Sequence, residues 1–217
     1  METGRPYPEH PDACRRAVSL IARVRDPLAV GRCRAVDAAV VPDPFRRLLA
    51  HNSHMTVAME RFHGAAVSLE IVRLVDHSGE AGADPFSYCR EILLRCPAVN
   101  PALFPAGPRE PSGRAAVVQY GVVGIALERL PAAVADEIRR GETPLGRILI
   151  AAGLHREVRE VRLLEMQPGP HLAGLFGGGP ENRVPTTYGR VATIDVAGTP
   201  VLRLLEVVGV PASTRRR

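Results

Sequence analysis

The stretch TYGRVATIDVAGTPVLRLLEVV, which spans Thr187–Val208, carries the clearest fold signal in the sequence. Apolar and β-branched residues dominate Thr187–Val196 and again Pro200–Val208, and the short segment between them, AGT at 197–199, has the composition of a turn. Two strand-like segments joined by a short loop containing Gly are typical of a β-hairpin. The sequence therefore predicts an antiparallel hairpin near its C-terminal end.

Four further segments upstream also have strand character: Ala65–Val75, Phe86–Cys96, Ala115–Leu127 and Glu157–Met166. Short helices are expected at Arg15–Val24, Phe45–His51, Met55–Phe62, Leu130–Arg140 and Thr143–Ala152, and proline-rich loops at Pro97–Gly113 and Pro168–Pro185. Most connections are turns, or helices that return at the same edge of the sheet. This pattern predicts an α+β fold with a single-domain antiparallel sheet of about six strands and flanking helices.

The length and the position of the prolines indicate the domain organisation. With 217 residues, of which 46% are hydrophobic and 24% charged, the chain can bury the core of one domain. Prolines punctuate the beginning of the sequence, so we expect an N-terminal extension over residues 1–42. The domain is then predicted to span residues 43–210, with a basic tail at residues 211–217.

All 28 basic residues are Arg, and the sequence contains no Lys. This excludes Schiff-base chemistry, a pyridoxal phosphate anchor and a phosphate-binding P-loop, each of which needs a Lys. An anionic ligand must instead be bound by Arg, His or backbone N–H groups, and Arg suits bidentate recognition of carboxylates. Three of the five net positive charges lie in Arg215–Arg217, and the chain has no Trp, so no nucleic-acid partner is expected.

Neither a cofactor nor a metal ion is expected from the motifs. The four cysteines lack metal-binding spacing, and no GxGxxG motif opens a helix after a strand. No apolar stretch approaches the roughly 20 residues of a membrane helix, and no signal-peptide pattern is present. We therefore expect a cytoplasmic protein with free thiols and no membrane association, while its oligomeric state stays open.

Two charged residues stand in rows that are otherwise mainly apolar. Alternation along Phe86–Cys96 places Arg90 on one face with Tyr88, Ile92 and Leu94, and the opposite face, with Ser87, Glu91 and Arg95, is expected to be solvated. Near the C-terminal end, Glu206 shares a face with Leu202, Leu204 and Val208, where desolvation raises the pKa of a carboxyl unless a cation compensates. Three interpretations stay open for these residues: a structural ion pair between Arg90 and Glu206, a barely buried rim, or a pocket for an anion with a hydroxyl group.

The segment TPLG at 143–146 predicts a helix start, with Thr143 as the N-cap and Pro144 at the first helical position. The N–H groups of Leu145 and Gly146 then lack partners within the helix and can bind either water or an anion.

Histidines cluster in the segment HNSHMT, with a third at His63. No acidic residue or Cys stands at a metal-ligand spacing from His51 and His54, so we interpret them first as polar residues at a helix end. The backbone of Ser53–Met55 could alternatively help to seat a ligand.

Five stretches, taken in order, resemble the chorismate pyruvate-lyase (4-hydroxybenzoate synthase) family. They are LLAHNSHMT (Leu48–Thr56), YCREILL (Tyr88–Leu94), IALERLP (Ile125–Pro131), TPLGRIL (Thr143–Leu149) and YGRVATIDVAGTPVLRLLEV (Tyr188–Val207). The resemblance covers most of the chain. It implies a single-domain antiparallel sheet whose helices and flap-like segments close an internal pocket, in which chorismate is converted to 4-hydroxybenzoate and pyruvate without a cofactor.

The resemblance also implies roles for individual residues. Arg90 would hold a carboxylate of the substrate and Glu206 would lie near its ring hydroxyl, with backbone N–H contacts at Leu145 and Met55. Many relatives carry a charged residue on the third strand where this chain has Val122, so Arg114 or Arg73 would have to supply a second carboxylate-binding group.

Two functions follow as expectations. The first is a lyase acting on chorismate or a related aromatic acid, with the Gly-rich loop 174–181 as a candidate lid. The alternative is a non-catalytic protein that binds small aromatic acids, either a sensor or a degenerate homologue of the same fold.

Overall fold

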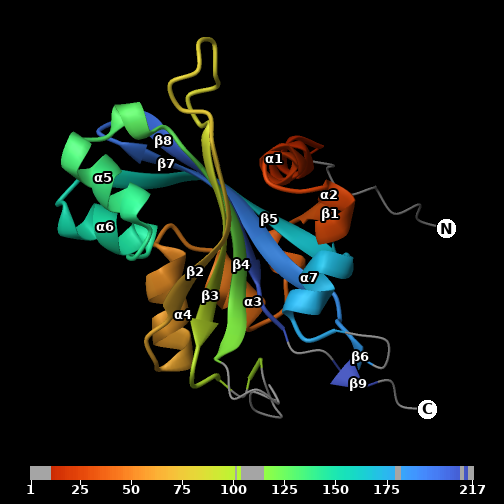
Figure 1. The fold of residues 1–217 in the computed structure, drawn as a ribbon. Helices are drawn as coiled ribbons and strands as arrows, with labels where there is room; N and C mark the ends of the chain where they lie inside the picture. The colour runs from red at the N-terminus through yellow and green to blue at the C-terminus, as the bar shows by residue number, and fades with distance from the viewer. Residues whose placement is uncertain (1–10, 101, 104–114, 179–181, 211–212, 215–217) are drawn as a thin grey trace.

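The fold is α+β and is built on one open antiparallel sheet of seven strands (Figure 1). The computed structural model describes residues 11–100, 102–103, 115–178, 182–210 and 213–214. The strand order is β1-β5-β7-β8-β4-β3-β2, and a separate two-stranded ribbon pairs β6 with β9. The strands are β1 (Gly31–Val36), β2 (Ser68–Asp76), β3 (Tyr88–Cys96), β4 (Ala116–Ile125), β5 (Arg156–Pro168), β6 (Asn182–Arg183), β7 (Thr187–Val196), β8 (Thr199–Val208) and β9 (Ser213–Thr214).

The predicted C-terminal hairpin is present as β7 and β8, which pair antiparallel from Gly189 opposite Val207 to Val196 opposite Thr199. Its two turn residues, Ala197 and Gly198, both have positive φ angles, of 48° and 80°. This backbone matches the right-handed twist of the strands that it connects, as in the tight turns that hairpins favour. All six predicted strands occur in the sheet, and the seventh, β1, comes from the segment that was expected to lie outside it.

Residues 11–41, which the sequence assigned to an N-terminal extension, pack onto the sheet. Helix α1 (Pro11–Ala22) buries Ala13, Ala17 and Ile21 against it, and β1 pairs with β5 at one edge. The prolines do not exclude this segment from the domain, because Pro27 occupies the first turn of helix α2 (Pro27–Val30), where a missing N–H costs nothing. Of the basic tail at residues 211–217, only Ser213 and Thr214 are among the described residues.

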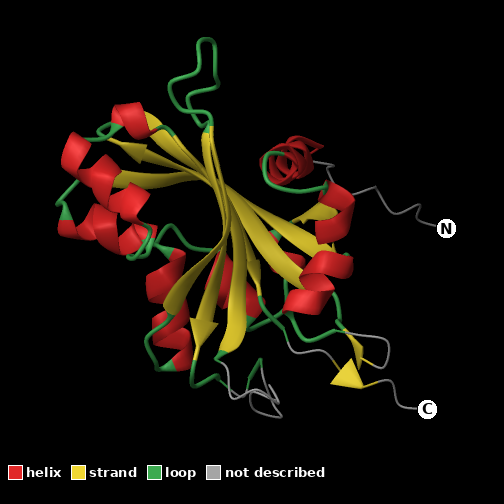
Figure 2. Cartoon of the chain, in the orientation of Figure 1, coloured by secondary structure: helices red, strands yellow, loops and turns green. Residues whose placement is uncertain are grey.

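The helices cover both sides of the sheet (Figure 2). Besides α1 and α2, the helices are α3 (Phe45–Leu49), α4 (Met55–His63), α5 (Ala132–Arg140), α6 (Leu145–Ala151), α7 (Pro170–Leu175) and the 3-10 helices η1 (Ala38–Val40) and η2 (Leu127–Arg129). Helices α4, α5 and α6 lie on one side of the sheet, whereas α1, α2 and α7 lie on the other (Figure 1). Helix α7 falls within the segment that was predicted to be a loop, and Pro170 stands in its first turn. Among the described residues, no helix has both the length and the apolar character needed to cross a membrane.

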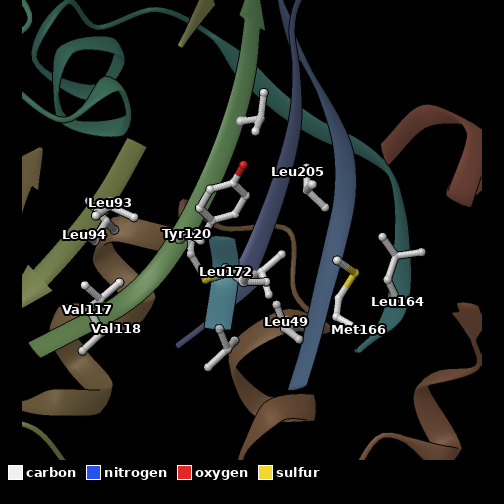
Figure 3. Packing of buried hydrophobic residues seen from close by; sticks show 14 of the residues in the cluster. Leu49, Leu93, Leu94, Val117, Val118, Tyr120, Leu164, Met166, Leu172 and Leu205 are labelled. Atoms are coloured by element: carbon white, nitrogen blue, oxygen red, sulfur yellow. The ribbon is translucent and has the colours of Figure 1, made fainter. Parts of the chain in front are cut away.

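Two clusters of buried side chains hold these layers together. The larger one joins the strands to α1, α3, α4 and α7, and Figure 3 shows Tyr120 and Leu205 from the sheet packed near Leu49 and Leu172 from the helices. The second cluster joins the sheet to α5 and α6 through residues such as Ile138 and Leu149. Burial of this apolar surface is the main favourable contribution to folding.

Glu91 is the centre of a buried polar network on the face of β3 that was expected to be solvated. Its side chain is fully buried and accepts two hydrogen bonds from Arg25, at 2.9 and 2.8 Å. The hydroxyl of Tyr120 donates to the same carboxylate at 3.1 Å, and Nε2 of His171 on α7 lies 2.9 Å from it. The expectation was wrong because strand alternation indicates which face a side chain is on but not whether helices cover that face.

Replacing Glu91 with Gln is expected to destabilise the protein by about 1–3 kcal/mol at pH 7, because the buried donors around it lose their charged acceptor. Burial by itself would raise the pKa of Glu91, but the hydrogen bonds and charge of Arg25 hold it below its ordinary value of 4.5. A carboxyl with a lower pKa in the folded state stabilises the fold above its unfolded pKa, and this contribution is lost as the pH falls through the folded pKa.

Urea unfolding at pH 7 and below pH 4.5 measures this difference. The wild-type protein should lose more stability on acidification than Glu91→Gln. Glu70→Gln is the control, since Glu70 pairs with Arg95 at the exposed surface and should contribute little. An identical acid dependence in wild type and Glu91→Gln would contradict the prediction.

Candidate active site

A cavity lies between the sheet and the N-terminal ends of α4 and α6. Strands β3, β4 and β8 contribute most of its lining, and all five residues singled out from the sequence border it: Met55, Arg90, Leu145, Gly146 and Glu206. Its volume is about 70 Å³, whereas one water molecule needs only about 10–15 Å³ by the same measure. The cavity therefore has room for a small organic molecule rather than a single water.

The cavity is lined mainly by apolar side chains, among them Leu69, Ile92, Val123, Ile125, Leu149, Ile194 and Leu204. Gly121 lies at the centre of the sheet, opposite Ile92 on β3 and Glu206 on β8. Because it has no side chain, it leaves the floor of the cavity open. A Cβ atom at Gly121 would lie 3.1 Å from Cγ1 of Ile92 and would crowd this space. Such a surface suits a flat or cyclic apolar body.

Arg90 places a buried positive charge beside this apolar surface. Its side chain is only 3% exposed. Its Nε and Nη2 donate hydrogen bonds of 3.2 and 2.7 Å to the hydroxyl of Tyr88. Nη2 also donates to the carbonyl of Ile138 near the end of α5, where the helix dipole favours a cation. Arg90 forms no ion pair with any described residue. A buried cation without a counter-ion is costly, so the arrangement favours an anionic ligand.

Glu206 is paired, but not with Arg90. Its Oε2 accepts a hydrogen bond of 2.7 Å from Nε of Arg190, which stands directly opposite it on β7. The structural ion pair between Arg90 and Glu206 that the sequence left open is therefore absent. Arg90 and Glu206 instead border the same cavity, each with a different neighbour.

Arg190 is a residue of the site that the sequence analysis missed. It is 1% exposed, and it donates to the backbone carbonyls of His51, Ser53 and Leu49 at 2.7, 3.1 and 3.4 Å. These bonds hold the loop that leads into α4 and thereby position Met55. The sequence contained a signal for Arg190. Alternation along β7 places it in one row with Ala192, Ile194 and Val196, which is as unusual for a charged residue as the apolar row of Arg90.

Two helix starts meet at the cavity. Along α4 and α6 the first backbone hydrogen bonds are donated by Ala58 and Arg147, so the N–H groups of Met55, Leu145 and Gly146 have no backbone acceptor among the described residues. Thr143 does not cap α6 as expected. Its hydroxyl donates to Glu137 instead, and Pro144 occupies the N-cap position.

His54 borders the cavity at the beginning of α4, and its Nε2 accepts a hydrogen bond of 2.5 Å from Nε of Arg156 on β5. Burial and the positive charge of Arg156 hold the pKa of His54 below its ordinary value. The ring packs against Gly146, where a Cβ atom would come within 3.1 Å of it. Within the described ranges, no group of three His, Cys, Asp or Glu side chains is arranged to hold a metal ion.

The other residues considered from the sequence lie elsewhere. Arg73 donates to the carbonyl of Val24 at 2.7 Å and does not line the cavity, and Arg114 lies outside the described residues. Of the candidate lid 174–181, residues 174–178 do not line the cavity and residues 179–181 are not described. Gln119, which the sequence did not indicate, does line it. Its buried Oε1 accepts no hydrogen bond from the described residues.

Comparison with known proteins adds no assignment at this point. No protein-family model matches the chain, and no curated protein matches it.

Proposed function

We propose that the protein is a lyase that binds chorismate in this cavity and converts it to 4-hydroxybenzoate and pyruvate. The supporting observation is the buried guanidinium of Arg90, which has no ion-pair partner among the described residues and borders a mainly apolar cavity. The apolar walls suit the carbon ring of chorismate, and Arg90 suits the carboxylate attached to that ring. The family resemblance of the sequence supplies the identity of the substrate.

The residues around the cavity support complementary roles. Arg90 binds the ring carboxylate, and the N–H groups of Leu145 and Gly146 add neutral donors. Glu206 accepts a hydrogen bond from the ring hydroxyl, since its pairing with Arg190 keeps a carboxylate oxygen at the cavity. Holding the substrate in one reactive conformation supplies much of the acceleration in such a reaction.

The chemistry balances without an oxidant or reductant. The C–H bond at the hydroxyl-bearing ring carbon breaks, and its electron pair forms the new ring double bond. The neighbouring C–O bond breaks with its electron pair on oxygen, which releases pyruvate as its enolate. The enolate methylene then takes up one proton, so the atoms of chorismate equal those of the two products. The aromatic ring that forms provides the driving force.

Purified protein incubated with chorismate should release 4-hydroxybenzoate, measured by chromatography. Glu206→Gln should reduce turnover by about 100-fold, because the charged acceptor of the ring hydroxyl is lost. Glu165→Gln is a matched control on β5, where Glu165 pairs with the mostly exposed Arg34. Absence of product above background in the wild type would refute the lyase, and full turnover in Glu206→Gln would refute the assignment of Glu206.

A non-catalytic aromatic-acid-binding protein is the second candidate, and one observation favours it. Arg90 is the only Arg among the described residues that line the cavity. Chorismate carries two carboxylates and 4-hydroxybenzoate only one, so a single Arg matches the smaller molecule. Calorimetric binding of 4-hydroxybenzoate without turnover of chorismate would support this alternative.

A further inference from the structure

Among the described residues that line the cavity, His54 is a titratable residue to which the proposed reaction has given no role. It stands at the N-cap of α4 and lines the cavity, and Arg156 reaches it from β5. The contact joins Nε of Arg156 to Nε2 of His54 at 2.5 Å. A short contact to an arginine is unusual for a histidine, since both groups can carry a positive charge.

The chemistry of Arg156 determines which nitrogen of His54 carries the proton. A guanidinium can only donate hydrogen bonds, so Nε2 must offer its lone pair, and the proton of the neutral ring is then on Nδ1. An imidazolium would instead place a donor and a second positive charge against Arg156. The charged groups that act on the ring are Arg156, Arg190 on β7 and Glu206 on β8, and the two arginines favour the neutral form.

The second ring nitrogen of His54, Nδ1, is available to donate a hydrogen bond. It has no hydrogen-bond partner among the described residues, although the ring borders the cavity. Gly146 lies beside it, and a Cβ atom there would be 3.2 Å from Nδ1. The absence of a side chain at Gly146 thus allows the imidazole to lie against the start of α6, next to the groups assigned to the substrate.

We propose that Arg156 holds His54 in the neutral form with its proton on Nδ1, and that this N–H donates a hydrogen bond to the ether oxygen of chorismate. The inference rests on the lyase proposed above. His54 is then a catalytic residue, and Arg156 is a positioning residue that acts through it.

The role is electrostatic and transfers no proton. As the ring C–O bond breaks, its electron pair moves to the ether oxygen, which becomes the enolate oxygen of pyruvate. A neutral N–H donor aimed at that oxygen stabilises the charge where it develops. Neutral imidazole serves as an electrophile in this way when neighbouring groups keep its pKa low. The proton lost from the ring is balanced by the one that the enolate methylene gains.

The tautomer can be measured in the protein without substrate. Nitrogen-15 NMR of histidine-labelled protein at pH 7 should show a protonated Nδ1 and an unprotonated Nε2 for His54, identified by its absence in His54→Asn. Arg156→Leu should remove this preference and give a mixture of the two neutral tautomers. A proton on Nε2 in the wild type, or a doubly protonated ring, would overturn the inference.

Turnover of chorismate tests the role of the donor. His54→Asn keeps an amide near the position of Nδ1, whereas His54→Gln carries its amide out to the position of Nε2. We expect kcat to fall about 100-fold in His54→Gln, with the affinity for 4-hydroxybenzoate nearly unchanged because the product lacks the ether oxygen. His54→Asn should retain much more activity than His54→Gln. His155→Gln, at an exposed position before β5, is the control and should match the wild type.

The two failures are distinguishable. If the wild type yields no 4-hydroxybenzoate, the lyase proposal fails and the ether-oxygen role fails with it, while the tautomer measurement still reports the effect of Arg156. If the wild type is active but His54→Gln turns over at the wild-type rate, only the inference about His54 fails.

Discussion

Arg90→Met is expected to weaken the binding of 4-hydroxybenzoate by about 100-fold or more, and to abolish measurable turnover of chorismate. Removing one partner of a buried charge pair costs about 2–5 kcal/mol, and each 1.4 kcal/mol corresponds to a tenfold change in affinity. Arg90 is 3% exposed and has no ion-pair partner among the described residues, so its charge is available to the ligand at close to full strength.

The stability of Arg90→Met should change far less than its binding. Methionine fills the apolar row between Tyr88 and Ile92 and removes the cost of burying a cation without a counter-ion. The lost hydrogen bonds to Tyr88 and Ile138 oppose this gain. A binding loss that far exceeds the change in unfolding free energy is the signature of a functional charge, because a structural one would lower both together.

Calorimetric titration with 4-hydroxybenzoate and urea unfolding measure the two quantities. Arg90→Lys should show an intermediate affinity, since it keeps the charge but loses the planar pair of donors. Arg32→Met, at an exposed position on β1, is the control and should bind like the wild type. Wild-type affinity in Arg90→Met would show that the cavity does not recognise a carboxylate through Arg90.

Arg190→Met is expected to destabilise the fold by about 3–5 kcal/mol, the usual effect of leaving one member of a buried ion pair alone. The substitution leaves the carboxylate of Glu206 without its ion-pair partner. It also removes the hydrogen-bond donors to the carbonyls of His51 and Ser53. The loop before α4 should therefore loosen, and the affinity for 4-hydroxybenzoate should fall because Met55 loses its fixed position.

Urea unfolding of a double-mutant cycle separates these effects. Arg190→Met combined with Glu206→Leu should recover part of the lost stability, since no carboxylate is then left unpaired. Arg203→Met on β8 is the control, because the contact of 3.9 Å between Arg203 and Asp84 lies at the surface and should contribute little. Equal stability of Arg190→Met and wild type would contradict the proposed organisation of the site.

Local alternation made much of the sheet and part of the site predictable. The six strands from Ala65 onward are rich in apolar and β-branched residues, and the turn at residues 197–199 has the residues that a hairpin needs. The same alternation marked Arg90 and Glu206 as charges in apolar rows. It would have marked Arg190 as well, had the row along β7 been compared with the other two.

Segments with little or conflicting local signal were assigned less well. Helix α1 and strand β1 were placed in an extension because prolines dominate that part of the sequence, although their apolar residues complete the core. Glu91 was expected to be solvated, yet helices α1 and α7 cover its face of the sheet. Neither outcome can be derived from neighbouring residues, since both depend on elements distant in the chain.

The sequence by itself determined which side chains share a face of each strand, and it thereby identified Arg90 and Glu206 as unusual. Only the tertiary structure decided their partners. Strand β4 separates β3 from β8, so Arg90 stands opposite Val123 and Glu206 opposite Gly121. The ion-pair partner of Glu206 is Arg190 on β7. The physical reason is that alternation is a property of one strand, whereas the pairing of charges depends on strand order, which long-range packing sets.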